Sequence, residues 1–213
     1  MSGLFITFEG CEGSGKSTQI ERLAERLRAH GLDVRTFREP GGVRDCDVGE
    51  QIRRVLLDPA NTDLGVRAEL LLYEASRAQL VEASYRPALA EGAVVLCDRY
   101  ADSSVAYQGY GRAVLSVGEV RELNRIATGG LVPDLTLLLD VDVASGLESA
   151  TTAGADRLEA AGLDFHQRVR EGYRAMAEAE PERFAVIERG GVDEVAEAVW
   201  RRVEPLLHRT GPV

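Results

Sequence analysis

Short apolar runs alternate along the whole chain with longer amphipathic segments. The apolar runs have the length and the unbroken hydrophobicity of strands buried on both faces. They predict strands at 4–9, 34–37, 93–97, 135–141 and 184–188. The segments between them repeat apolar residues at helical spacing and predict helices at 16–30, 49–57, 66–83, 117–128, 163–179 and 193–207. The alternation therefore predicts an α/β protein with a five-stranded parallel sheet flanked by helices on both faces.

Two places interrupt this alternation. Pro87 is expected to start the short turn that precedes the third strand. Residues 144–161 replace apolar periodicity with alanine, threonine and glycine, which within a compact domain predicts a short mobile flap more than a linker. Because no internal repeat or low-complexity linker divides the sequence, we expect a single domain over residues 1–213.

Composition and charge narrow the class of protein. The 213 residues are 45% hydrophobic, enough for an ample core without disulfide or metal staples. Three cysteines without a C-x-x-C pair favour reduced thiols, and the apolar runs are too short to cross a membrane. With no charged-then-apolar leader either, we expect a cytoplasmic protein that spans no membrane. A net charge of −10 repels nucleic acid polymers, so the expected ligand is a small nucleotide.

The segment that joins the first strand to the first helix carries the strongest chemical signal. It follows the pattern G-x-x-x-x-G-K-[ST] of phosphate-binding loops, and Lys16 is the only lysine in the chain. In such loops glycines let backbone N–H groups converge on phosphate, the lysine reaches the β- and γ-phosphates, and the serine ligates Mg²⁺. The alternative is a glycine-rich turn with an incidental lysine. The residues predicted to bind ATP are Gly10, Cys11, Glu12, Gly13, Ser14, Gly15, Lys16, Ser17 and Thr18.

A carboxylate and an arginine follow the third predicted strand. In open parallel sheets ligands collect at the carboxyl ends of strands, so Asp98 is expected beside the phosphate loop, where with Ser17 it would hold Mg²⁺ or its water shell. Arg99 would face the same crevice. The alternative is an Asp-Arg pair that merely ends a strand.

Four segments together carry a family resemblance. They are the phosphate loop with acidic Glu12, the turn Arg38-Glu39-Pro40-Gly41-Gly42, the triplet Asp98-Arg99-Tyr100, and Ser103-Ser104-Val105-Ala106-Tyr107-Gln108-Gly109. In order and nearly in spacing, this combination resembles bacterial thymidylate kinase over most of the chain. The resemblance implies a P-loop NTPase fold and a homodimer. It also implies transfer of the ATP γ-phosphoryl group, with Mg²⁺, to dTMP, giving dTDP for dTTP synthesis.

The resemblance also implies an acceptor site. Tyr73 and Arg77 are four residues apart on a predicted helix and share a face, where the family stacks an aromatic ring on thymine and reads its O4 with an arginine. Without the family, they would be a core tyrosine and a surface arginine. Ser104 matches the residue that bonds the pyrimidine edge, and Tyr107 the one that crowds the sugar 2′ position. Read alone, both are ordinary loop residues.

Charged residues complete the implied acceptor site. Glu12 corresponds to the acidic residue that accepts a hydrogen bond from the sugar 3′-hydroxyl. Arg53 and Arg99 correspond to arginines that hold the acceptor phosphate, and the loop from Val43 to Val48 is longer than usual before Arg53. Gln108 completes the predicted substrate-binding set.

The flap departs from the family pattern. Relatives with this type of phosphate loop place several arginines there, whereas within 144–161 this chain keeps only Arg157. Lys16, Asp98, Arg99 and Arg157 are therefore the predicted catalytic residues. Two alternatives remain open: a deoxynucleoside kinase, which needs a carboxylate base at the acceptor hydroxyl, or a nucleotide-binding relative with weak catalysis.

The remaining polar positions give weaker signals. His30, His166 and His208 have no partner at metal-ligand spacing and are expected at the surface or at helix ends. The mixture of acidic residues and arginines over 166–183 is expected to form a solvated helix face, and Trp200 a core or interface residue.

Overall fold

Five parallel strands form one central sheet in the order β2-β3-β1-β4-β5. The computed structural model describes residues 3–42, 47–150 and 162–207, the side chains of 149 and 150 excepted. The strands are β1 (Leu4–Glu9), β2 (Val34–Arg38), β3 (Val94–Asp98), β4 (Leu135–Asp140) and β5 (Phe184–Glu188). Each lies within one residue of its predicted position at both ends, so the predicted parallel sheet is confirmed.

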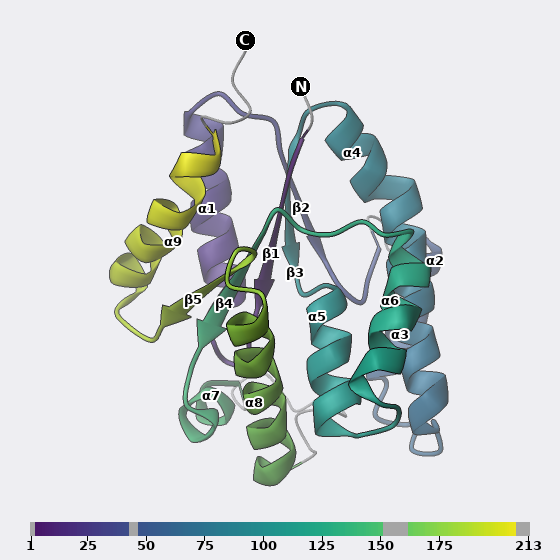
Figure 1. The fold of residues 1–213 in the computed structure, drawn as a ribbon. Helices are drawn as coiled ribbons and strands as arrows, with labels where there is room; N and C mark the ends of the chain where they lie inside the picture. The colour runs from purple at the N-terminus through teal and green to yellow at the C-terminus, as the bar shows by residue number, and fades with distance from the viewer. Residues whose placement is uncertain (1–2, 43–46, 151–161, 208–213) are drawn as a thin grey trace.

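Helices cover both faces of this sheet, as the alternation predicted (Figure 1). The described α-helices are α1 (Lys16–Ala29), α2 (Val48–Leu57), α3 (Val66–Leu80), α4 (Arg86–Ala90), α5 (Ala101–Ser104), α6 (Val117–Thr128), α7 (Val143–Ala150), α8 (Leu163–Ala179) and α9 (Val192–Leu207). The described part of the chain also contains two π-helical turns. The turn η1 (Val81–Tyr85) joins α3 to α4, and η2 (Val105–Gly111) continues the helical path of α5. Within the described ranges, no helix is both long enough and apolar enough to cross a membrane.

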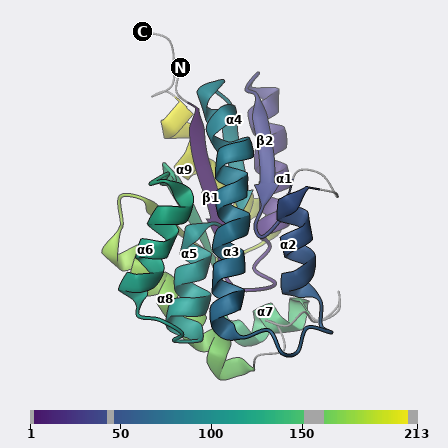
Figure 2. The same cartoon turned by 90° about the vertical axis from the view of Figure 1, so that its right-hand side faces the viewer.

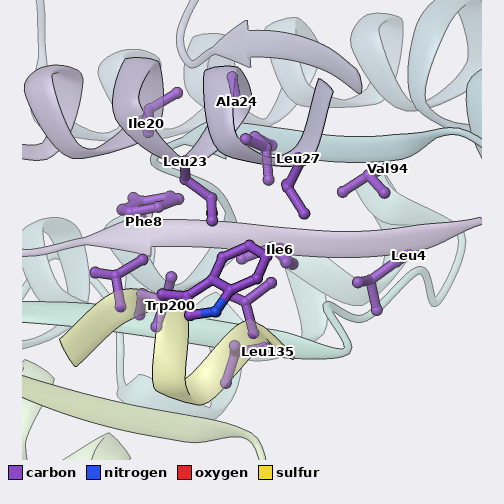
Figure 3. Close-up of a cluster of buried hydrophobic side chains, with 14 of the residues drawn as sticks. Leu4, Ile6, Phe8, Ile20, Leu23, Ala24, Leu27, Val94, Leu135 and Trp200 are labelled. Carbon is purple, nitrogen blue, oxygen red and sulfur yellow. The ribbon is translucent and has the colours of Figure 1, made fainter. Parts of the chain in front are cut away.

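Side chains along β1 alternate between the two faces of the sheet and so belong to two different parts of the core. Ile6 and Phe8 pack with α1 and with Trp200 of α9, which confirms Trp200 as a core residue (Figure 3). Phe5 faces the opposite side, among residues of η1 and α4. Because successive side chains of a strand point to opposite faces, Glu9 points to the same side of the sheet as Phe5. Despite its carboxyl group, Glu9 is fully buried there. A carboxylate thus enters the core on the side that also carries α5 and α8.

The chain stays helical where a turn was predicted at Pro87. The helix that begins at Val66 continues through η1 into α4 and ends at Ala90, so the expected turn at Pro87 is wrong. A π-helical turn shifts the hydrogen-bond register immediately before Pro87. The missing N–H of the proline therefore does not end the helical path.

Two further helical segments escaped the sequence patterns. Residues 101–111, expected as loop, form α5 and η2, although two serines and two glycines give this stretch weak helix propensity. The buried side chains of Val105 and Tyr107, packed with those of α8, supply the order that propensity lacks. The first part of the predicted flap is helix α7, and its remaining residues, 151–161, lie outside the described residues.

Candidate active site

The phosphate loop closes tightly around its own lysine. Gly10 has φ of 138°, and a Cβ atom there would lie 2.5 Å from the Leu139 carbonyl oxygen, so only glycine fits. Lys16 is the first residue of α1, and its ammonium group donates to the carbonyl oxygens of Gly10 at 3.2 Å and Cys11 at 3.0 Å. Burial, with Arg99 nearby, lowers the pKa of Lys16. A buried cation beside a helix N-terminus is an arrangement suited to phosphate.

A hydroxyl and a carboxylate meet beside this lysine. The Ser17 hydroxyl at the start of α1 donates to Asp98 Oδ2 at 3.2 Å, at the carboxyl end of β3. The described residues hold no group of three or more His, Cys, Asp or Glu side chains placed to bind a metal. Magnesium prefers oxygen ligands and often takes only one or two from the protein, with phosphate and water completing its shell. Ser17 and Asp98 fit that requirement.

Arg99 connects the third strand to the phosphate loop. Its backbone is left-handed, with φ of 67°, and its N–H donates to the Phe8 carbonyl oxygen at 2.9 Å. The guanidinium donates to Glu12 Oε1 at 2.9 Å and to the Gly10 carbonyl oxygen at 3.0 Å. Although burial opposes charge on Arg99, Tyr107 and Glu12 hold its pKa well above the ordinary value. A fixed cation therefore lies on the loop.

Glu12 is held as a carboxylate. The Tyr107 hydroxyl lies 2.7 Å from both of its oxygens, and Arg99 occupies the Oε1 side. Burial would raise the pKa of Glu12, but Arg99, His166, Lys16 and Tyr107 together lower it well below its usual range. The structure thus brings together Glu12, Arg99 and Tyr107, which the sequence predicted separately.

Glu9 is a site residue that the sequence patterns did not single out. It accepts from the Tyr100 backbone N–H at 2.7 Å, the Ser103 hydroxyl at 2.6 Å and the Tyr173 hydroxyl at 2.8 Å. Both hydroxyls also lie 3.3 Å from Arg99 Nη1. Burial, reinforced by the nearby Asp102 carboxylate, raises the pKa of Glu9 to about 7. Glu9 therefore supports the turn that carries Arg99.

Arg77 is buried, with 1% of its side chain exposed, and is not the surface arginine of the alternative reading. Its Nε donates to Glu39 at 2.8 Å, and its Nη1 lies within hydrogen-bond distance of Glu74, Ser104 and Asn124. Burial opposes charge on Arg77, but the Glu74 and Glu39 carboxylates raise its pKa above the ordinary value. The predicted Arg77 and Ser104 are therefore in contact.

The other predicted substrate residues lie around this network. Tyr73 is half-buried on α3, one turn before Arg77, as predicted. Arg53 of α2 donates to the Pro40 carbonyl oxygen at 2.6 Å, in the turn after β2, and the peptide bond before Pro40 is cis. Gln108 is buried, and its amide lies 3.4 Å from Glu69. Arg157 lies outside the described residues.

Helix α8 turns one stripe of side chains toward the site. His166 approaches Glu12, Tyr173 bonds Glu9, and both Arg170 and Arg174 pair with Asp140 at 2.6 and 2.9 Å. His166 lies in the first turn of α8, which agrees with the expected helix-end position, but it is 1% exposed and is therefore not a surface residue. The solvated helix face expected over 166–183 is confirmed for Arg168, Glu171, Arg174 and Glu178, which are exposed, whereas Arg170 is half-buried. The signal in the sequence that could have identified this stripe is the spacing of positions 166, 170, 173 and 174, because those residues share a helix face.

A cleft of about 160 Å³ extends from the phosphate loop to the segment between β5 and α9. Its floor includes Gly13 and Thr18 of the loop, and Val192 and Val195 of α9 form part of its apolar wall. Arg189 lines the same cleft. A polar end at the loop and an apolar wall beyond it suit the phosphates and the base of a nucleotide.

Comparisons with known proteins show which family the chain resembles. The thymidylate kinase family model matches residues 8–199. The thymidylate kinase of Solidesulfovibrio magneticus is 54% identical over 213 aligned residues, which cover 96% of this chain and 100% of the relative. The thymidylate kinase of Deinococcus radiodurans is 52% identical, and the alignment covers 97% of this chain and 98% of the relative.

A solved structure gives the same result for the fold. The crystal structure of thymidylate kinase from Ehrlichia chaffeensis superimposes with a TM-score of 0.78 at 32% identity, covering 96% of this chain and 100% of that one. Because the family model matches residues 8–199, and because curated relatives match nearly the full length of the chain, the chain belongs to the thymidylate kinase family.

Proposed function

We propose that this chain phosphorylates dTMP to dTDP with ATP and Mg²⁺, by direct in-line transfer, in the synthesis of dTTP. One observation carries the proposal: the cation of Arg99 contacts both the carbonyl of Gly10 and the carboxylate of Glu12. The residue assigned to the acceptor thus touches the loop assigned to the donor. Family membership supports dTMP as the acceptor.

Positioning and charge account for the chemistry. Lys16 and the loop N–H groups hold the donor phosphates, and Arg99 draws the acceptor phosphate toward them, which offsets repulsion between two anions. Ser17 and Asp98 are the residues that would hold Mg²⁺, which screens the phosphate charges when bound. No covalent intermediate is required, because the acceptor phosphate is itself the nucleophile.

The acceptor base is assigned to the pocket around Arg77. Tyr73 would stack on thymine, and Ser104 would bond its edge beside Arg77, with which it is in contact at 2.9 Å. Nη2 of Arg77 donates to the Tyr100 carbonyl oxygen at 3.0 Å, and its second hydrogen is assigned to the O4 carbonyl. Tyr107 would exclude a ribose 2′-hydroxyl, with Arg53 and Gln108 lining the site.

The same enzyme is proposed to work in the cytoplasm as a homodimer. Helices α2, α3 and α6 lie side by side on one flank of the molecule (Figure 2). Large apolar side chains are exposed on each of them, including Val55 at 44%, Leu71 at 55% and Ile126 at 64%. Covering such side chains with a second copy removes apolar surface from water. Sedimentation equilibrium should give twice the chain mass; a monomer at micromolar concentration contradicts this part.

A coupled assay tests the activity. With ATP and Mg²⁺, dTMP should be turned over faster than other nucleoside monophosphates, and thymidine should not be phosphorylated. Turnover of thymidine instead would favour the deoxynucleoside kinase, with Glu12 as the required carboxylate. Binding of ATP and dTMP without turnover would favour the weakly catalytic relative.

A further inference from the structure

His166 is a buried polar side chain whose ring nitrogens lack a close hydrogen-bond partner. It lies in the first turn of α8, and 1% of it is exposed. Within the described part of the chain, neither of its ring nitrogens makes a hydrogen bond of normal geometry, although the ring lies near enough to Glu12 to help lower the pKa of that carboxyl. Leaving a buried donor or acceptor unpaired is costly, and such groups in native proteins usually acquire a partner in the functional state.

The ring of His166 lies beside a carboxylate of the proposed acceptor site. His166 Nδ1 lies 3.5 Å from Glu12 Oε2, which is the outer limit of a hydrogen bond. The Phe165 ring, 5.1 Å away and nearly perpendicular, packs beside the imidazole. Hydrogen bonds of active sites are often long without substrate and shorten when it binds.

The two oxygens of Glu12 are unequally supported. Oε1 receives both the Arg99 guanidinium at 2.9 Å and the Tyr107 hydroxyl at 2.7 Å. Oε2 accepts from the same Tyr107 hydroxyl, which it shares with Oε1. Oε2 also lies on the side of His166. One hydroxyl hydrogen cannot serve both oxygens fully, so a further donor on the Oε2 side would fix the carboxylate plane.

We propose that His166 is a positioning residue for Glu12. When the acceptor binds, Nδ1–H of His166 closes onto Oε2 and holds the carboxylate toward the sugar 3′-hydroxyl of the acceptor. This inference rests on the proposed function, since it requires dTMP beside Glu12. The role is distinct from that of Arg99, which neutralises charge, because an imidazole N–H at this position sets orientation.

Two substitutions separate positioning from packing. His166→Phe keeps a flat ring without a donor, whereas His166→Asn removes the ring but keeps an N–H near the place of Nδ1. We expect His166→Phe to raise KM for dTMP about tenfold with a smaller change in kcat, the size of effect expected from one lost hydrogen bond to a charged group. His166→Asn should stay within about threefold of the wild type.

A second acceptor supplies the internal control. 3′-Deoxythymidine 5′-monophosphate lacks the hydroxyl that Glu12 is assigned to bind, so His166→Phe should change its KM by less than about twofold. Equal losses on both acceptors, together with a lower melting temperature, would mean that His166 only packs. Wild-type kinetics in His166→Phe would also overturn the inference. Both results differ from failure of the proposed function, in which the wild type itself does not turn over dTMP.

A measurement on the unmodified protein completes the test. In ¹⁵N-labelled wild type, adding dTMP should move the Nδ1 resonance of His166 to that of a protonated, hydrogen-bonded nitrogen. The 3′-deoxy analogue should produce a smaller change. An imidazole that keeps the same tautomer and shift when dTMP saturates the site contradicts the inference, even if the variants do not fold.

Discussion

Arg99 and Glu12 form an ion pair of 2.9 Å that joins the end of β3 to the phosphate loop. The two groups come from positions 87 residues apart in the sequence. The pair also contacts Tyr107, whose hydroxyl bonds Glu12 and whose ring lies 5.0 Å from the Arg99 guanidinium carbon. The phosphate loop and the residues proposed to bind the acceptor are therefore connected directly, and a change in either Arg99 or Glu12 should affect both.

Replacing the single lysine by arginine should cost much more than a conservative change normally does. The Lys16 ammonium fits between two carbonyl oxygens at 3.2 and 3.0 Å, and a planar guanidinium cannot occupy that position in the same way. We expect Lys16→Arg to lower kcat by at least about 10²-fold. Steady-state kinetics with saturating dTMP check this, with Arg22→Lys on the exposed face of α1 as the matched control. Near-normal turnover by Lys16→Arg would refute the assigned role.

Selectivity for the base should depend on Arg77. Because dCMP presents a 4-amino donor where dTMP presents a carbonyl, the wild type should prefer dTMP by roughly 5- to 150-fold in kcat/KM. Arg77→Ala should narrow that ratio. It should also destabilise the protein, since it leaves the buried Glu39 and Glu74 carboxylates without their cation, a loss of about 3–5 kcal/mol.

For Arg77→Ala, the useful quantity is kcat/KM for dTMP divided by kcat/KM for dCMP. Loss of folded enzyme lowers both rates equally and cancels in the ratio. Equal efficiency of the wild type on dTMP and dCMP would remove the thymine assignment, while the fold would stand.

Glu9 should make stability depend on pH in a definite direction. Its folded pKa is about 7, above that of an unfolded glutamate, so between pH 4.5 and 7 the folded state holds a proton that the unfolded state has lost. The contribution of Glu9 to the free energy of unfolding is therefore largest near pH 4.5 and decreases as pH rises to 7. Glu9→Gln should remove this contribution.

Denaturant titrations at several pH values check the prediction. The difference in unfolding free energy between wild type and Glu9→Gln should change steadily from pH 4.5 to 7 and then level off. Taking the difference matters because burial also raises the pKa of Glu39 to about 7, so the wild-type curve alone contains both groups. A difference that does not vary over this range contradicts the raised pKa of Glu9.

The sequence predicted what local patterns encode. Each strand was found because parallel strands are continuous apolar runs, and the phosphate loop because its pattern is fixed within eight residues. Tyr173 and Glu9 were missed because they meet across 164 residues, and neither belongs to a recognisable motif. Their pairing depends on how α8 lies against the sheet. Helix α5 was missed for a related reason, since its order comes from tertiary packing rather than propensity.

The flap raises the question of which cation stabilises the transferring phosphoryl group. Arg157 is the only arginine in 144–161. If it acts in the transition state, Arg157→Ala should lower kcat by about 10²-fold or more with little change in dTMP affinity. Ala153→Arg, which adds a second cation to the flap, should raise kcat by about tenfold. Single-turnover measurements separate these effects from product release.

If neither Arg157→Ala nor Ala153→Arg changes kcat, the next candidates for the catalytic cation are arginines of α8. Arg170 donates to Asp140 Oδ1 at 2.6 Å, and Asp140 lines the cleft beside the phosphate loop. Arg174 contacts the same carboxylate at 2.9 Å, so two cations share one anion at the edge of the proposed donor site. Arg170→Ala should then produce the loss of kcat expected of Arg157→Ala, with Arg168→Ala, also on α8 but bonded to the Gly111 carbonyl oxygen, as the matched control. If Arg157→Ala alone slows the chemical step, the Asp140 pairs serve to hold α8 against the sheet.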